Sequence, residues 1–140
     1  SQHIWLGTSV ESGRVDHRID ALRQVPAAVR FLSCEPLIGP IPNLNLDGIH
    51  WVIVGGESGN HLWTDRTRQR RALVEYQDGE WRPREDRKDW VRAIRRRCQQ
   101  DDVPFFFKQW GGVTPYRQKY GNLEREGTHP VSASSPASPH

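Results

Sequence analysis

The sequence predicts an α/β fold with about four parallel strands, and two observations support this prediction. Four short apolar runs lack the polar alternation of a half-solvated strand, which is typical of strands buried on both faces of a parallel sheet. Polar side chains follow each run directly, as they do at the ligand-binding edge of α/β folds. A chain of 140 residues is long enough for one such domain with its own core.

Each of the four apolar runs is closed by polar residues. The strands are expected at residues 3–10, 27–34, 49–55 and 103–110. The residues that close them are Ser9 and Glu11, Ser33 and Glu35, Glu57 and Ser58, and Lys108 and Gln109. If the strands are parallel, these clusters meet at one rim of the sheet. The rim is then either a ligand site or a solvated edge, and we favour the ligand site.

The first and second strands are joined by a helix predicted at residues 14–25. Its apolar positions recur at four- and three-residue spacing, at Val15, Ile19 and Leu22. Ser12 is a candidate N-cap, because its hydroxyl can accept a backbone N–H at the start of a helix. The next connection, residues 36–47, contains three prolines and is expected to be an irregular crossover.

The third strand leads into the glycine-rich sequence WVIVGGESG. Gly55 and Gly56 permit a tight turn or the close approach of a ligand to the backbone. Glu57 and Ser58 can then form hydrogen bonds with that ligand. The alternative is a strand followed by a glycine turn with solvated polar residues, and a short glycine motif does not separate the two.

Residues 61–86 resemble an insertion that contains a β-hairpin. The Asp78-Gly79 pair separates two short β-prone runs, which is a hairpin signal. No helix is expected in the insertion, because no apolar stripe in it is long enough. A helix should follow, from Asp86 or Asp89 to about residue 100. Its apolar positions are Trp90, Ile94 and Cys98, with Val91 beside them.

Arginine and aromatic side chains are interleaved in the insertion. The candidate nucleic-acid or partner-binding residues are Trp63, Arg66, Arg68, Arg70, Arg71, Trp81, Arg82 and Arg84. Arginine beside stacking aromatic rings is typical of a nucleic-acid surface. Interspersed carboxylates such as Asp65 and Glu75 favour the alternative, a solvated hairpin with internal ion pairs. The net charge of the whole chain, +3, is too small to decide between a nucleic-acid surface and a solvated hairpin.

Composition and spacing argue against several classes of protein. Cys34 and Cys98 are the two cysteines, too few for a disulfide framework or a metal cassette, and we expect buried, reduced thiols. No targeting segment or apolar run of membrane length occurs, so a soluble, cytoplasmic protein is expected. The histidines lack ligand spacing and Ser58 lacks an elbow motif, so neither a metal site nor a hydrolase is expected. The Ser/Pro-rich residues 131–140 should be mobile.

Four segments occur in a characteristic order: TSVE (residues 8–11), FLSCEPL (31–37), WVIVGGESG (51–59) and PFFFKQWG (104–111). Together they resemble a phage- and bacteria-associated family known as phage protein of unknown function, which is itself similar to radical S-adenosylmethionine enzymes. The resemblance covers about residues 3–112. It implies a partial (β/α) barrel, the C-terminal half of a larger barrel. Residues 113–140 lack periodicity and are expected to form an irregular tail, which departs from this family.

The resemblance also implies that the rim binds S-adenosylmethionine. WVIVGGESG is similar to a glycine-containing segment that lies beside the adenine of the cofactor in such enzymes. By the same resemblance, Glu35 is placed to meet the ribose, and Lys108 and Gln109 lie near the adenine or the substrate. The candidate cofactor-binding residues are thus Glu35, Gly55, Gly56, Glu57, Ser58, Lys108 and Gln109.

The sequence departs from this family in its cysteines. The family has a three-cysteine motif for a [4Fe–4S] cluster in its N-terminal half, whereas this sequence has only Cys34 and Cys98, far apart. No independent catalysis is therefore expected, and no cofactor is expected for the chain alone beyond S-adenosylmethionine binding by resemblance.

Two functions remain open. The chain is either the cofactor- and substrate-facing part of a split or truncated enzyme, or a phage-encoded protein that binds and inhibits a host machine. In both cases a protein partner is expected at the outer edge of the strand at residues 3–10: the missing half, a second copy or a host protein. Nucleic acid is a further candidate partner, at the insertion, and no membrane role is expected.

Overall fold

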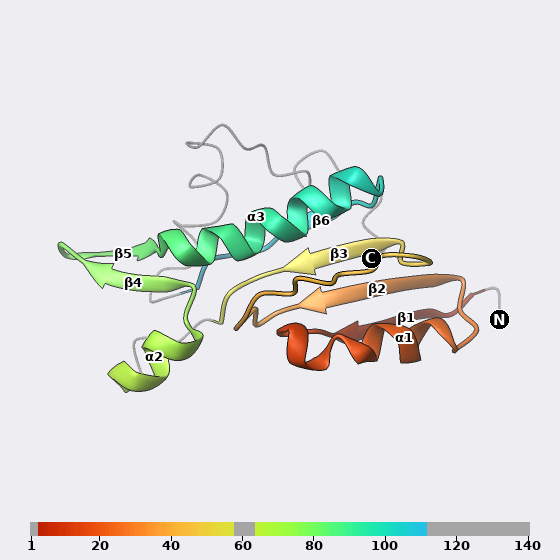
Figure 1. The fold of residues 1–140 in the computed structure, drawn as a ribbon, viewed down its shortest axis with the longest axis horizontal. Helices are drawn as coiled ribbons and strands as arrows, with labels where there is room; N and C mark the ends of the chain where they lie inside the picture. The colour runs from red at the N-terminus through yellow and green to blue at the C-terminus, as the bar shows by residue number, and fades with distance from the viewer. Residues whose placement is uncertain (1–2, 58–63, 112–140) are drawn as a thin grey trace.

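A computed structural model describes residues 3–57 and 64–111 of the chain (Figure 1). Its central sheet has four parallel strands, which confirms the predicted fold class. They are β1 (Trp5–Ser9), β2 (Val29–Cys34), β3 (Trp51–Val54) and β6 (Phe105–Phe107), in the spatial order β1-β2-β3-β6. Each strand is shorter than the apolar run that predicted it. Because spatial order follows chain order, right-handed crossovers place all three connections on one face of the sheet.

One face of the sheet is fully buried. Two rows of side chains cross it in register, Leu32–Val52–Phe105 and Cys34–Val54–Phe107, and none of them is exposed. The connecting elements cover this face: α1 (His17–Arg23) buries Ile19 and Leu22 there, and α3 (Glu85–Gln100) buries Val91, Ile94 and Cys98. The predicted apolar stripes of both helices are therefore confirmed.

The opposite face carries aromatic side chains that are only half-buried. The rings of Phe31 and Trp51 stack with centroids 4.4 Å apart and an interplanar angle of 11°. Phe106 meets Trp51 edge-on at 5.6 Å. None of the helices among residues 3–57 and 64–111 lies over this row. The sheet thus has one helix-covered face and one face that none of the described helices covers, whereas a purely parallel sheet usually has helices on both.

The crossover between β2 and β3 is irregular, as its prolines predict. It lies in the same layer as the helices and is tied to α1 through Arg23, whose guanidinium donates to Asp47 O (2.7 Å) and Asn45 O (2.6 Å). Its apolar residues enter the core, and they are Leu37, Ile41, Leu44, Leu46 and Ile49. Two backbone carbonyls of this loop thus accept hydrogen bonds from the Arg23 side chain, in place of the backbone hydrogen bonds that a helix would provide.

Two helix starts differ from the prediction. Ser12 caps a short 3₁₀ helix, η1 (Gly13–Val15), by accepting from Arg14 N at 3.3 Å, and α1 begins only at His17. The helix α3 begins at Glu85, so Asp86 and Asp89 lie inside it rather than at its cap. Pro83 closely precedes this start, and a proline there is compatible with the end of a strand.

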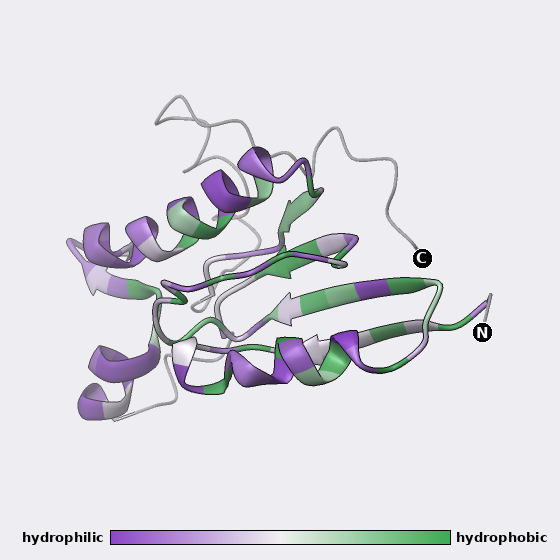
Figure 2. Cartoon of the chain, turned by 45° about the vertical axis from the view of Figure 1, so that its right-hand side comes forward, coloured by the Kyte–Doolittle hydropathy of each residue, from purple (hydrophilic) through white to green (hydrophobic). Residues whose placement is uncertain are grey.

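The inserted segment contains a helix that the apolar pattern did not predict. This helix, α2 (Asp65–Arg71), buries no residue, and Figure 2 shows it as hydrophilic throughout, in contrast to the apolar strands. Thr64 caps it, because the Thr64 side chain accepts from Thr67 N at 3.3 Å. The local signals for this helix were the Thr64 cap, the acidic Asp65 in the first turn and the arginines in the last turn.

The predicted hairpin is confirmed. Strands β4 (Val74–Gln77) and β5 (Glu80–Pro83) are antiparallel and joined by a two-residue turn. Asp78 and Gly79 have φ values of 52° and 78°, the left-handed pair that a tight hairpin turn needs. Among the residues that the structure describes, no helix is both long and apolar enough to cross a bilayer. The predicted mobile tail lies outside the described residues.

Candidate ligand site at the carboxyl edge of the sheet

The carboxyl ends of β2, β3 and β6 place Glu35, Gly55 and Lys108 in one row. The strand register extends by one residue to this row, and Lys108 N donates to Val54 O at 2.8 Å to continue the ladder. Lys108 Nζ lies 3.1 Å from Glu35 Oε1. The ion pair therefore spans three strands at the edge where α/β folds bind ligands.

Gly55 leaves the space that the Glu35 carboxylate fills. A Cβ atom at Gly55 would lie 2.3 Å from Glu35 Oε2, which is closer than any real contact. The Oε2 atom is itself buried and accepts no hydrogen bond from the described residues. A buried carboxylate oxygen without a donor is energetically costly. This oxygen thus has unused acceptor capacity, which a hydroxyl or amine of a ligand can use when the flexible carboxylate turns toward solvent.

The space beside Gly56 is filled by the backbone that follows β6. Gly56 N donates to Gln109 O at 2.7 Å, and Gln109 Nε2 donates to Gly56 O at 3.4 Å. A Cβ atom at Gly56 would lie 1.9 Å from Trp110 O. The glycine is therefore required for the backbone after β6 to pass close to the end of β3, a contact between two parts of the chain.

The other two acidic residues of the rim pair with helical arginines. Arg18 Nη1 of α1 lies 3.1 Å from Glu11 Oε2, and Arg71 Nη2 of α2 lies 2.9 Å from Glu57 Oε2. The described residues of all four predicted clusters thus lie at one edge of the sheet, and an ion pair joins two of the clusters through Glu35 and Lys108. The pair between Arg71 and Glu57 ties α2 to the end of β3. Ser58 lies outside the described residues.

The arginines predicted as a binding surface have different environments. Arg68 pairs with Asp65 at 3.6 Å and lies over the Trp81 ring at 5.7 Å, and Arg82 pairs with Glu80 at 3.4 Å. Arg66 and Arg70 are exposed on α2. The remaining two candidates of this set, Arg71 and Arg84, form ion pairs within the chain, and Trp63 lies outside the described residues.

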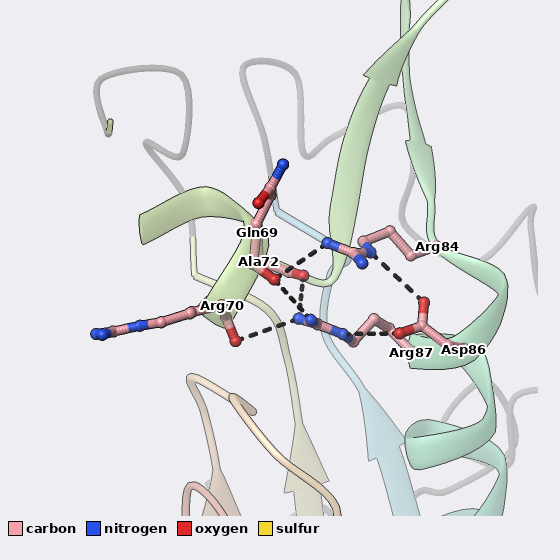
Figure 3. A network of polar contacts seen from close by, with 6 residues as sticks. All are labelled: Gln69, Arg70, Ala72, Arg84, Asp86 and Arg87. Atoms are coloured by element: carbon pink, nitrogen blue, oxygen red, sulfur yellow. Dashed lines mark hydrogen bonds and ion pairs between the residues drawn. The ribbon is translucent and has the colours of Figure 1, made fainter. Parts of the chain in front are cut away.

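Arg84 and the buried Arg87 form a structural network rather than an open surface (Figure 3). Arg87 donates to Ala72 O (2.8 Å), Gln69 O (2.7 Å) and Arg70 O (3.4 Å), so it caps the C-terminal end of α2. Arg84 Nη1 also donates to Gln69 O at 3.1 Å. No sequence pattern singles out Arg87, because arginines in a charge-rich run are normally solvated, yet this side chain is buried.

Asp86 joins the two arginines of this network. Its carboxylate lies 3.5 Å from Arg84 and 3.3 Å from Arg87. Partial burial alone would raise the pKa of Asp86, but the charge of Arg84 and the hydrogen bond from Arg87 outweigh it, and the pKa is lowered. Burial lowers the pKa of Arg87. The guanidinium carbon of Arg87 lies over the Trp90 ring, 4.4 Å from its centroid.

The two cysteines do not form a metal site. Cys34 and Cys98 are both buried in the core, and burial raises the pKa of both thiols, to about 12 for Cys98. Within residues 3–57 and 64–111, no three His, Cys, Asp or Glu side chains are placed to hold a metal ion. A [4Fe–4S] cluster needs three thiolates, so it does not fit these residues.

Comparison with known proteins places the chain in a family. A family model described as "Protein of unknown function (DUF5131)" matches residues 1–76 and 77–130. The chain belongs to this family. The DUF5131 match includes every described strand and helix, and its two segments meet inside the β4–β5 hairpin, next to Tyr76. No curated protein and no solved structure matches the chain.

Proposed function

We propose that this DUF5131 chain is the cofactor- and substrate-facing part of a radical-S-adenosylmethionine-like (β/α) barrel. In this proposal the rim binds S-adenosylmethionine, and the chain performs no radical chemistry alone. The observation that supports it is the buried Glu35 Oε2, which lacks a donor among the described residues. It lies at the carboxyl edge of a parallel sheet, the usual ligand edge of such folds.

The chemistry of Glu35 fits the ribose of the cofactor. An ionised carboxylate accepts hydrogen bonds only, and the ribose diol offers two hydroxyl donors. Lys108 Nζ contacts the other carboxylate oxygen, Oε1, at 3.1 Å, which leaves Oε2 for the ligand. When bound, S-adenosylmethionine supplies the reactive adenosyl or methyl group, and the residues of this chain bind and orient it.

The arrangement of the sheet supports a larger barrel. All connections lie on one face, and the half-buried row of Phe31, Trp51 and Phe106 lies on the other. Side chains on that second face fill the interior when a sheet closes into a barrel. Glu35 and Lys108 continue the same face at its carboxyl end. The occupant that this face fits is a polypeptide supplying the remaining parallel strands.

Titration calorimetry with S-adenosylmethionine tests the cofactor part of the proposal. We expect saturable binding by the unaltered chain and its loss in Glu35→Ala, because the acceptor for the ribose is removed. Glu75→Ala, which removes an exposed carboxylate of the hairpin, is the matched control and should bind normally. Absence of saturable heat from the folded chain, or equal binding by Glu35→Ala, would overturn the proposal.

Light scattering and an apolar dye test the barrel part. A sheet face that lacks its partner should bind the dye or cause self-association. The substitution Trp51→Ser should reduce either signal, because it removes the tryptophan ring that contacts both Phe31 and Phe106 on this face. A monomer that binds no dye would contradict this part of the proposal.

A further inference from the structure

We infer that α2 and the hairpin form a binding surface for single-stranded nucleic acid, independent of the proposed cofactor site. A concave region of about 830 Å³ lies between α2 and β4. Four arginines and two carboxylates line it together with Tyr76, so the surface is net positive. We call this region the basic hollow, and the residues that the argument uses are Arg66, Arg68, Arg70, Arg84, Glu75 and Tyr76.

Arg66 and Arg70 are the phosphate-binding candidates of the basic hollow. They are four residues apart on α2 and therefore lie on the same side of the helix. Both side chains are exposed, and neither forms an ion pair or a hydrogen bond within the described part of the chain. The other two arginines of the basic hollow form ion pairs within the chain, Arg68 with Asp65 and Arg84 with Asp86.

Tyr76 supplies a platform for a nucleobase. Its side chain is 62% exposed, the most exposed of the large hydrophobic residues in the described ranges. Trp81 supports it edge-on, with ring centroids 5.4 Å apart and an angle of 61°. An edge-on neighbour leaves a face of the Tyr76 ring open, and base stacking on such a face tolerates any sequence.

The walls of the basic hollow are fixed before any ligand arrives. Arg87 and Arg84 bind the last carbonyls of α2 and so hold this helix against the start of α3 (Figure 3). Arg84 N also donates to Leu73 O at 2.9 Å, next to β4. A surface that is already ordered loses less entropy on binding, which favours affinity.

The combination of charge and aromatic ring favours a single strand over other polyanions. Phosphates can contact Arg66 and Arg70 while an unpaired base stacks on Tyr76. A duplex hides its bases in the stack, and an acidic peptide without aromatic residues offers no flat ring system for Tyr76. The expected ligand is therefore a single-stranded oligonucleotide bound without strong sequence preference.

Fluorescence anisotropy with a labelled mixed-sequence oligonucleotide of about 20 nucleotides tests this inference, using the full chain without S-adenosylmethionine. Binding should weaken as salt is raised, because phosphate contacts release counterions. The Arg66→Ala/Arg70→Ala variant should bind at least about tenfold more weakly. Tyr76→Ala should also bind more weakly, by roughly threefold or more, since the stacking platform is lost.

The control has the same loss of charge at a different place. Arg14 and Arg96 are exposed arginines of η1 and α3, so Arg14→Ala/Arg96→Ala removes two positive charges outside the basic hollow. This variant should bind within about twofold of the unaltered chain if the contact is local. Equal weakening by both double variants, equal binding of a duplex, or full competition by poly-glutamate would overturn the inference. Glu35→Ala should bind the oligonucleotide normally, which separates this test from that of the cofactor site.

Discussion

Lys108 and Glu35 are 73 residues apart in the chain, yet Lys108 Nζ lies 3.1 Å from Glu35 Oε1 across the backbone of Gly55. The side chains are 53% and 25% exposed, so the ion pair contributes little to stability. Its consequence is orientation: one carboxylate oxygen is held by the lysine, and the other is buried over the end of β3. The two glycines that follow this strand then have separate roles, which substitution can distinguish.

Gly55→Ala should affect ligand binding more than stability. The added Cβ would displace the Glu35 carboxylate, but that group ends a flexible side chain and can move away. We expect the free energy of unfolding to change by no more than about 1 kcal/mol, while affinity for S-adenosylmethionine falls. Urea denaturation and calorimetry measure the two quantities. Unchanged affinity would mean that the position of Glu35 over β3 is irrelevant to binding.

Gly56→Ala should affect stability first. Its Cβ would lie 1.9 Å from the carbonyl oxygen of Trp110, which belongs to the backbone and cannot rotate away, so the two chain segments must separate. We expect a loss of about 3 kcal/mol in the free energy of unfolding. Urea denaturation compares this variant with Gly55→Ala. Equal free energies of unfolding for the two variants would contradict the close approach of Gly56 to Trp110.

Arg87→Ala should destabilise the chain strongly. Three carbonyl oxygens, of Gln69, Arg70 and Ala72, lose a charged donor, and the expected cost is about 3 kcal/mol. Arg96→Ala on the exposed side of the same helix should stay within about 0.5 kcal/mol. Arg87→Lys should lie between them, because an ammonium cannot reproduce the guanidinium fork. Equal stability of all three variants, measured by thermal unfolding, would contradict the network.

The thiols should be unreactive in the folded chain at neutral pH. Burial raises the pKa of Cys34 and Cys98, so neither forms the thiolate that reacts with disulfide reagents. A thiol reagent should label both residues only at the rate of unfolding, in contrast to immediate labelling in urea. Fast labelling without urea would show that the core between β2 and α3 is open.

The same two thiols predict a loss of stability in alkali. The unfolded thiols titrate near their ordinary pKa of 9.0, whereas the folded thiols keep their protons to about pH 12 for Cys98. Above pH 9 the folded state therefore binds more protons than the unfolded state, and stability falls as pH rises. Cys98→Ala should flatten this slope between pH 9 and pH 11 in denaturation curves. A slope identical to that of the unaltered chain would contradict the burial of Cys98.

Local signals in the sequence were sufficient for most of the fold. The apolar runs predicted four parallel strands, and Asp78-Gly79 predicted the hairpin, because strand burial and turn geometry depend on neighbouring residues. The helix α2 was missed, because it has no apolar face and is held instead by Thr64, by Arg84 and by Arg87 of α3. Periodicity cannot predict a helix that buries no apolar side chains and is held by hydrogen bonds to distant residues.

The sequence alone determined that polar residues close every strand and that these residues share one edge of a parallel sheet. Only the tertiary structure decided which of them meet: Glu35 contacts Lys108, Glu57 contacts Arg71, and Gly56 receives the backbone of Trp110. The physical reason is that periodicity and turn preference are properties of neighbouring residues, whereas these contacts join strand ends far apart in the chain. Their partners follow from strand order and side-chain packing, which the sequence pattern does not contain.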